Sequence, residues 1–128
     1  MNTVIIIEDE KDARETLREH LSSYRDLVIV GECDNGMEGI EKINALRPDI
    51  LFLDIHLPGI NGFQVLQQLV HKPSIIITSA FEAYAAKAFN YDAIDYLLKP
   101  FCAERFAIAI KKVKLALLDT AMENDHGK

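Results

Sequence analysis

The hydrophobic residues of the chain fall into two alternating patterns. Five short apolar runs, typical of parallel strands that are buried on both faces, occupy residues 3–7, 27–30, 50–53, 74–79 and 94–98. Apolar residues recur at helical spacing in the segments that follow these runs, namely 13–24, 37–43, 63–70, 82–89 and 103–118. Strands that alternate with helices predict an α/β fold, a doubly wound parallel sheet of five strands in the flavodoxin-like order 2-1-3-4-5.

Polar residues and prolines mark the ends of the predicted helices. Asp12 and Asn61 are expected to cap the first and third helices, and Pro48 to stop the second. Val70 is expected to point inward with the other apolar residues of the third helix. The last helix is expected to end near Leu118, because the residues beyond it are mostly polar.

Length and composition indicate one soluble globular domain. The chain has 128 residues, of which 49% are hydrophobic and 27% are charged. We assign residues 1–120 to this domain and residues 121–128 to a polar tail or the start of a linker. The formal net charge of −6 argues against direct DNA binding by this segment.

The sequence predicts a cytoplasmic protein. It shows no basic, apolar-centred leader and no apolar span long enough for a membrane helix. The two cysteines, Cys33 and Cys102, lack CxxC spacing. Reduced thiols are therefore favoured over a disulfide or a thiolate metal site.

Charged and hydroxyl-bearing residues follow directly after four of the predicted strands. Glu8 and Asp9 follow the first strand, Asp54 the third, Ser79 closes the fourth and Lys99 follows the fifth. Singly, each has an ordinary explanation, such as a turn cap for Asp54. Together they predict one cleft, where clustered carboxylates favour Mg²⁺ and where a lysine and a hydroxyl can neutralise a phosphoryl group. Asp54 is the natural nucleophile.

Four motifs carry a resemblance to a known family. They are IIIEDE (5–10), LFLDIHLPGING (51–62), ITSA (77–80) and DYLLKPF (95–101). In combination they resemble the receiver domain of two-component response regulators over residues 3–118. The stretch 78–101 further resembles receivers that are attached to LytTR-type (LytR/AlgR-like) DNA-binding domains.

The resemblance implies a role for each matching residue. Asp54 is implied to accept a phosphoryl group from a sensor histidine kinase in a Mg²⁺-dependent reaction. Ser79 and Lys99 are implied to contact that group, and Tyr96 to move inward beside Ser79. The implied metal ligands are Glu8, Asp9, Asp54 and the backbone carbonyl of His56.

The same resemblance implies a signalling output. Movement at Ser79 and Tyr96 is expected to alter the face formed by the fourth helix, the fifth strand and the fifth helix. That face could form a homodimer, and transcription is the expected output, through a DNA-binding domain absent from this chain. No membrane partner is expected.

Two other functions compete with this interpretation. A Mg²⁺-dependent phosphohydrolase could also use an aspartyl-phosphate, but it usually needs a second acid two residues after the nucleophile, where His56 stands. A docking module that is never phosphorylated would not need the intact set of acids, hydroxyl and lysine. We therefore expect a phosphoacceptor with at most slow self-dephosphorylation. His56 and Phe81 are expected to flank the path of water to the phosphorus and to slow its loss.

The last predicted helix carries apolar residues on two sides. Ile108 and Leu115 fall opposite the stripe expected to face the core. With Tyr84 and Tyr91 on the neighbouring helix region, they are expected to mark a surface for a partner.

Overall fold

The computed structural model describes residues 1–126, with side chains described through Met122. Its centre is a parallel sheet in the order β2-β1-β3-β4-β5, which confirms the predicted fold. The strands are β1 (Asn2–Ile7), β2 (Leu27–Cys33), β3 (Ile50–Asp54), β4 (Ser74–Ser79) and β5 (Asp95–Leu98). The helices are α1 (Lys11–Leu21), α2 (Gly36–Leu46), α3 (Gly62–Gln67), α4 (Ala85–Asn90) and α5 (Ala103–His126), with a 3-10 turn, η1, at Glu82–Tyr84.

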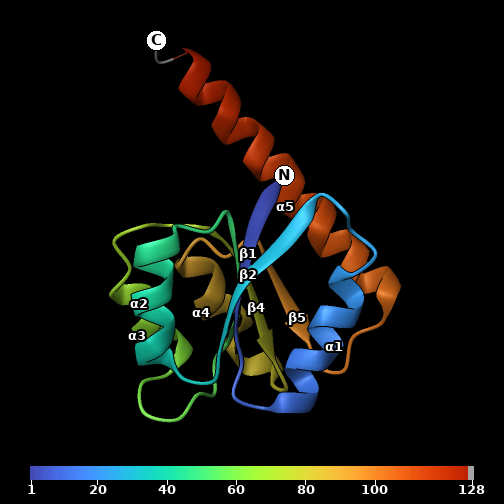
Figure 1. The fold of residues 1–128 in the computed structure, drawn as a ribbon. Coiled ribbons are helices and arrows are strands. Elements are labelled where there is room, and N and C mark those ends of the chain that lie inside the picture. The colour runs from blue at the N-terminus through green and yellow to red at the C-terminus, as the bar shows by residue number, and fades with distance from the viewer. Residues whose placement is uncertain (127–128) are drawn as a thin grey trace.

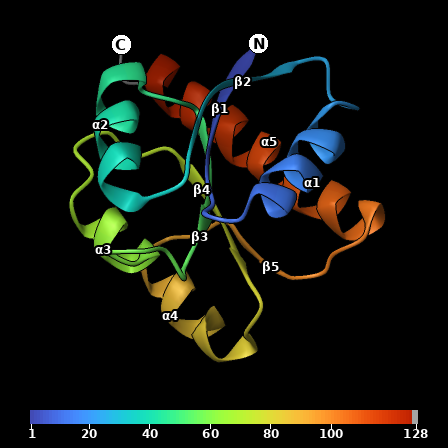
Figure 2. The same cartoon turned by 60° about the horizontal axis from the view of Figure 1, so that its bottom comes forward.

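Helices cover both faces of the sheet. Figure 1 shows α1 and α5 on one side and α2, α3 and α4 on the other, and the turned view in Figure 2 keeps the same division. The central strands therefore send alternate side chains into two separate cores, which explains why they are apolar at every position. Val4, Ile6, Ile50 and Phe52 belong to the core under α1 and α5, and Ile5, Ile7, Leu51 and Leu53 to the other core.

Helix boundaries confirm one predicted cap and correct two other details. Asn61 caps α3, accepting a hydrogen bond from the Gln64 amide at 2.9 Å. Asp12 is not a cap, because α1 begins at Lys11 and places Asp12 inside its first turn. Val70 does not point inward but is 82% exposed, since α3 ends at Gln67 and the helical period stops there.

Helix α2 packs on the sheet through glycine. Met37 is exposed, whereas Gly36 and Gly39 are buried. A Cβ atom at Gly39 would overlap Cδ1 of Ile7, so the glycine lets the helix approach β1 closely.

Tyr84 and Tyr91 do not extend an exposed partner surface, contrary to the sequence prediction. Both rings pack against the core between the sheet and helices α3 and α4. The Tyr91 hydroxyl also accepts a hydrogen bond from Nε2 of Gln67 at 2.8 Å. Half-buried tyrosines of this kind use the ring for packing and the hydroxyl for a polar contact.

Helix α5 continues well past Leu118, where the sequence predicted its end. Its buried residues lie between Phe106 and Val113, and its last turns lead away from the sheet (Figure 1). Asp119 and Met122 are exposed, so a mostly polar composition did not prevent helix formation there. No helix within residues 1–126 is long and apolar enough to cross a lipid bilayer.

A buried acid fastens α5 to the sheet. Asp95, at the start of β5, accepts hydrogen bonds from both terminal nitrogens of Arg105, at 2.8 and 2.7 Å. Lys112 adds an ion pair at 3.5 Å. Burial alone would raise the pKa of Asp95, but Arg105, the Tyr96 amide and Lys112 together outweigh it and hold the pKa below its usual value.

We expect deletion of residues 119–128 to lower the melting temperature in dilute solution by no more than a few degrees. The described side chains of this segment are exposed, so little apolar surface is lost from the core. Ile110→Ala, which removes a buried side chain of the same helix, is the control and should cost about 2–5 kcal/mol. A comparable loss from the deletion would mean that the tail packs on the domain.

Candidate functional site

The carboxyl ends of four strands bring the predicted site residues to one edge of the sheet. Glu8 follows β1, Asp54 ends β3, Ser79 ends β4 and Lys99 follows β5. Strand register aligns these ends, with Asp54 paired to Thr78 on the neighbouring strand. The site is therefore a direct consequence of the strand order.

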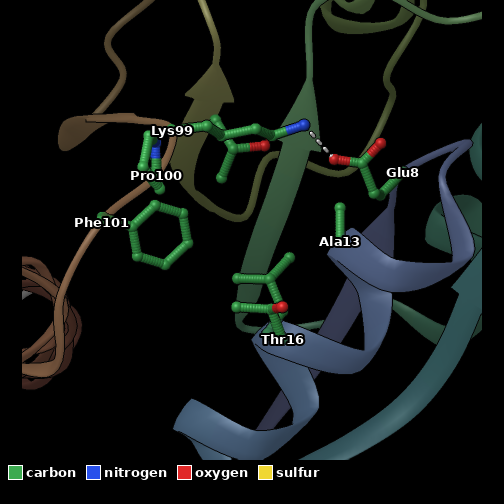
Figure 3. A pocket seen from close by; sticks show the side chains of 8 residues that line it. Glu8, Ala13, Thr16, Lys99, Pro100 and Phe101 are labelled. Atoms are coloured by element: carbon green, nitrogen blue, oxygen red, sulfur yellow. Dashed lines mark hydrogen bonds and ion pairs between the residues drawn. The ribbon is translucent and has the colours of Figure 1, made fainter.

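Lys99 joins two buried acids at this edge. Its ammonium group donates to Oε1 of Glu8 and lies 3.3 Å from Oδ2 of Asp54. Glu8 is fully buried and Asp54 is 4% exposed. Figure 3 shows the Lys99 side chain extending across the cleft toward Glu8. Two acids from different strands are thus held by one cation from a third.

Burial and mutual repulsion shape the charges of the cleft. Burial, together with the neighbouring Asp54, raises the pKa of Glu8, and contact with Lys99 only partly opposes this. Burial and Glu8 also raise the pKa of Asp9. Burial alone would lower the pKa of Lys99, but Glu8 and Asp54 outweigh it and raise the pKa. The cleft therefore favours a bound positive charge.

The loop after β1 supplies a compact group of oxygen ligands. Carboxylate oxygens of Glu8, Asp9 and Glu10 lie within 4.8 Å of one another. Asp9 and Glu10 are exposed, whereas Glu8 points inward and accepts a hydrogen bond from the Glu10 amide at 3.2 Å. Arg14 steadies the loop by donating to the carbonyl oxygen of Glu8 at 2.8 Å. Hard oxygen donors of this kind fit Mg²⁺.

Only some of the predicted metal ligands belong to the group of clustered acids formed by Glu8, Asp9 and Glu10. Asp54 lies in the same cleft, linked to Glu8 through Lys99, but it is not one of the three clustered acids. Its Oδ1 accepts a hydrogen bond from the backbone amide of His56 at 3.2 Å.

Ser79 and Tyr96 meet through the backbone of Phe81. The Ser79 hydroxyl oxygen accepts a hydrogen bond from the Phe81 amide at 3.0 Å, and the Tyr96 hydroxyl donates to the Phe81 carbonyl. Tyr96 is buried in this structure. The loop after β4 is therefore tied to both residues.

Three aromatic rings from the loop after β3, the loop after β4 and the turn η1 pack against one another. His56 meets Phe81 and Tyr84 edge to face, at centroid distances of 5.0 and 5.3 Å. Phe81 is 54% exposed, and His56 is also exposed. These rings stand beside Asp54 and on the loop that follows Ser79.

A cavity of about 170 Å³ lies on the α1 side of Lys99. In Figure 3, Ala13 and Thr16 project from α1 on one side, and Pro100 and Phe101 lie on the other. Thr78 also lines the cavity; its hydroxyl is buried and lacks a hydrogen-bond partner among the described residues. The complete lining consists of Glu8, Ala13, Thr16, Leu17, Thr78, Lys99, Pro100 and Phe101.

Comparison with known families agrees with this arrangement. Residues 4–111 match the family model described as the response regulator receiver domain. The chain belongs to this family. The receiver domain has solved relatives of the same fold, including the response regulatory domain of mrkE from Klebsiella pneumoniae. That structure has a TM-score of 0.82 and 33% identity, and the match covers 89% of this chain and 96% of that one.

Curated relatives extend beyond a receiver domain of this size. The Transcriptional regulatory protein BtsR of Escherichia coli (strain K12) is 45% identical over 116 residues, which cover 89% of this chain and 48% of BtsR. An uncharacterized response regulatory protein of Shewanella oneidensis is 39% identical over 124 residues, covering 95% of this chain and 52% of that protein. The receiver domain thus spans about half the length of the curated relatives it matches.

Three residues at the site were not given a role by sequence reasoning. Glu10 completes the acidic group, and Arg14 donates to the carbonyl oxygens of Glu8 and Asp9. Thr78 carries a buried hydroxyl that has no hydrogen-bond partner in the part of the chain that the structure describes. The run of three acids was a visible signal for Glu10. Nothing in the sequence signals the contacts of Arg14, because they depend on how α1 sits against the loop.

We expect Thr78→Val to raise the free energy of unfolding by about 1 kcal/mol, because it removes a buried hydroxyl that has no partner while keeping a branched side chain. Urea denaturation measures this change. Ser79→Ala is the matched control and should lower stability by a similar amount, since the Ser79 hydroxyl does accept a hydrogen bond. A less stable Thr78→Val would show that its hydroxyl is satisfied.

Proposed function

We propose that Asp54 accepts a phosphoryl group from a sensor histidine kinase and that the receiver domain works as a phosphorylation-controlled switch. The observation that carries the proposal is the contact of Lys99 with both Asp54 and Glu8. A lysine beside a buried carboxylate at the carboxyl edge of the sheet is suited to stabilise an added phosphoryl group.

Transfer requires that the bond from phosphorus to a kinase histidine nitrogen breaks as a bond to a carboxylate oxygen of Asp54 forms. The protein contributes position and charge. The His56 amide holds Oδ1 of Asp54, and Lys99 neutralises part of the charge that develops on the phosphoryl oxygens.

Glu8 and Asp9, with Asp54 and the backbone carbonyl of His56, are the residues we propose to hold Mg²⁺. The acidic group that includes Glu10 supports a divalent cation at this place. When bound, the cation would offset the repulsion between the phosphoryl group and the acids.

We propose that the loop after β4 carries the response. The Ser79 hydroxyl oxygen accepts from the Phe81 amide, which leaves its own proton free to donate to a phosphoryl oxygen. Because Tyr96 is bonded to the carbonyl of the same Phe81, a shift of the loop is passed on to β5. The face made by α4, β5 and α5 is then the surface that changes, and a homodimer through it would report the change.

Transcription is the output we propose, through a DNA-binding domain outside this chain. The name of BtsR as a transcriptional regulatory protein supports this, as does the match to half of its length. The net charge of −6 disfavours DNA contact by the receiver domain itself. A LytTR-type output domain is the specific form we propose, on the resemblance of residues 78–101.

We propose no turnover of free substrates by this domain, only acceptance of a phosphoryl group and its slow loss. Membership of the receiver family does not favour the phosphohydrolase alternative. Steady release of phosphate from small phosphate esters would support that alternative instead.

Incubation with a small acyl-phosphate donor and Mg²⁺ should add one phosphoryl group, and Asp54→Asn should abolish it because the amide is a poor nucleophile. Intact-protein mass spectrometry measures the addition. Asp34→Asn, at an exposed acid outside the cleft, should be labelled like the wild type. Undiminished labelling of Asp54→Asn would refute the assignment, and labelling unaffected by a chelator would refute the need for a cation.

The phosphorylated state should decay over minutes or longer, since His56 and Phe81 shield the phosphorus from water. Decay of labelled protein with Mg²⁺, after the donor is removed, measures this lifetime. His56→Ala and Phe81→Ala should each speed the decay, and Phe89→Ala, at a similarly exposed phenylalanine on α4, should not. Slower decay of His56→Ala would mean that histidine orients the attacking water.

A further inference from the structure

Helix α5 carries a second apolar stripe on the side opposite its buried residues. Phe106, Ile110 and Val113 face the sheet. Four other residues are each more than half exposed, with exposures of 51, 55, 57 and 53% for Ile108, Leu115, Leu118 and Met122. We name these four residues the α5 stripe. Exposed apolar residues aligned along one helix differ from the scattered ones of an ordinary surface.

The spacing of the α5 stripe is that of a coiled coil. Ile108, Leu115 and Met122 are seven residues apart, and Leu118 lies three after Leu115 and four before Met122. In heptad terms, the first three occupy a positions and Leu118 a d position. The stripe extends along α5 from Ile108 to Met122, and the last turns of this helix lead away from the sheet (Figure 1).

We propose that the α5 stripe is the seam of a parallel two-stranded coiled coil between two copies of this chain. The proposal does not depend on phosphorylation, because the stripe is exposed in the structure as it stands. It also differs from a dimer through the α4–β5–α5 face, since the seam uses α5 alone and reaches beyond the domain body.

Charge complementarity favours a second copy in parallel orientation. Lys114 and Asp119 occupy the flanking g and e positions, and in a parallel pair each Lys114 lies beside Asp119 of the other copy. Lys114 pairs with Asp26 of its own chain at 2.8 Å, so a contact with Asp119 of the other copy would share or replace this ion pair. In an antiparallel pair that joins Leu115 to Leu118, Met122 would instead face Lys111 of the other copy.

Lys111 weakens the seam because of its position in the heptad. It occupies the remaining d position, where the two copies would bring their ammonium groups together. The side chain is exposed and long enough to turn its charge outward. The dimer should therefore form only at high protein concentration, and removal of this charge should strengthen it.

Sedimentation velocity of the unphosphorylated chain over a wide concentration range tests the seam. The wild type should move from monomer toward dimer as concentration rises. Lys111→Leu should tighten the dissociation constant about tenfold or more, because it adds an apolar contact and removes a repulsion. Leu115→Lys combined with Leu118→Lys should leave only monomer. These substitutions lie at exposed positions, and circular dichroism verifies that the variants remain folded.

Two control substitutions separate this seam from other surfaces. Val70→Lys changes an equally apolar but unrelated exposed site and should leave the dimer intact. Phe89→Lys, on the exposed side of α4, should also leave it intact. Loss of the dimer with Phe89→Lys, or no effect of Lys111→Leu, would overturn the proposal.

Orientation is tested by cross-linking in a chain whose two cysteines are replaced by serine. In a parallel coil Leu118 meets its own copy, so Leu118→Cys should oxidise readily to a disulfide-linked dimer. Asp34→Cys, at an exposed site outside α5, is the control and should form no disulfide-linked dimer. Failure of Leu118→Cys to cross-link at concentrations where the dimer forms would overturn the parallel arrangement.

Discussion

One ammonium group, Nζ of Lys99, organises the acidic cleft at the carboxyl edge of the sheet in this receiver domain. Glu8 is fully buried and Asp54 nearly so, and buried carboxylates from separate strands repel each other unless a cation lies between them. Lys99 reaches them from the edge strand β5, across the end of β4. The strand order, the length of the lysine and the position of β5 must therefore all be right for the acids to coexist.

An apolar boundary strengthens these interactions. The cavity beside Lys99 is bounded mainly by carbon atoms, including those of Leu17, Pro100 and Phe101. Charges at the border of such a region interact more strongly than they would in bulk water. In the same apolar setting the Thr78 hydroxyl has no hydrogen-bond partner among residues 1–126, and burying it costs free energy.

The sheet and most of the cleft could be predicted from the sequence. Apolar runs ending in acids, hydroxyls and a lysine predict both the strand order and the meeting of Glu8, Asp54 and Lys99, because parallel strands end at a common edge. Details that depend on packing were missed. Val70 follows the helical period of α3, but the helix stops before it. The close approach of α2 to β1 at Gly39 was also missed, because it depends on the position of the Ile7 side chain.

Helix α5 can amplify a small movement of the domain. Its base is clamped to β5 by the paired contacts of Asp95 with Arg105, while the nine residues after Leu117 extend freely by about 14 Å at 1.5 Å per residue. A tilt at the clamp that is too small to disturb the core becomes a larger displacement at the far end. The helix also fixes the direction in which an attached group points, because successive residues are rotated by about 100° around the helix axis. Insertion of one residue into α5 would therefore re-aim whatever the helix carries, whereas insertion of seven would nearly preserve its direction.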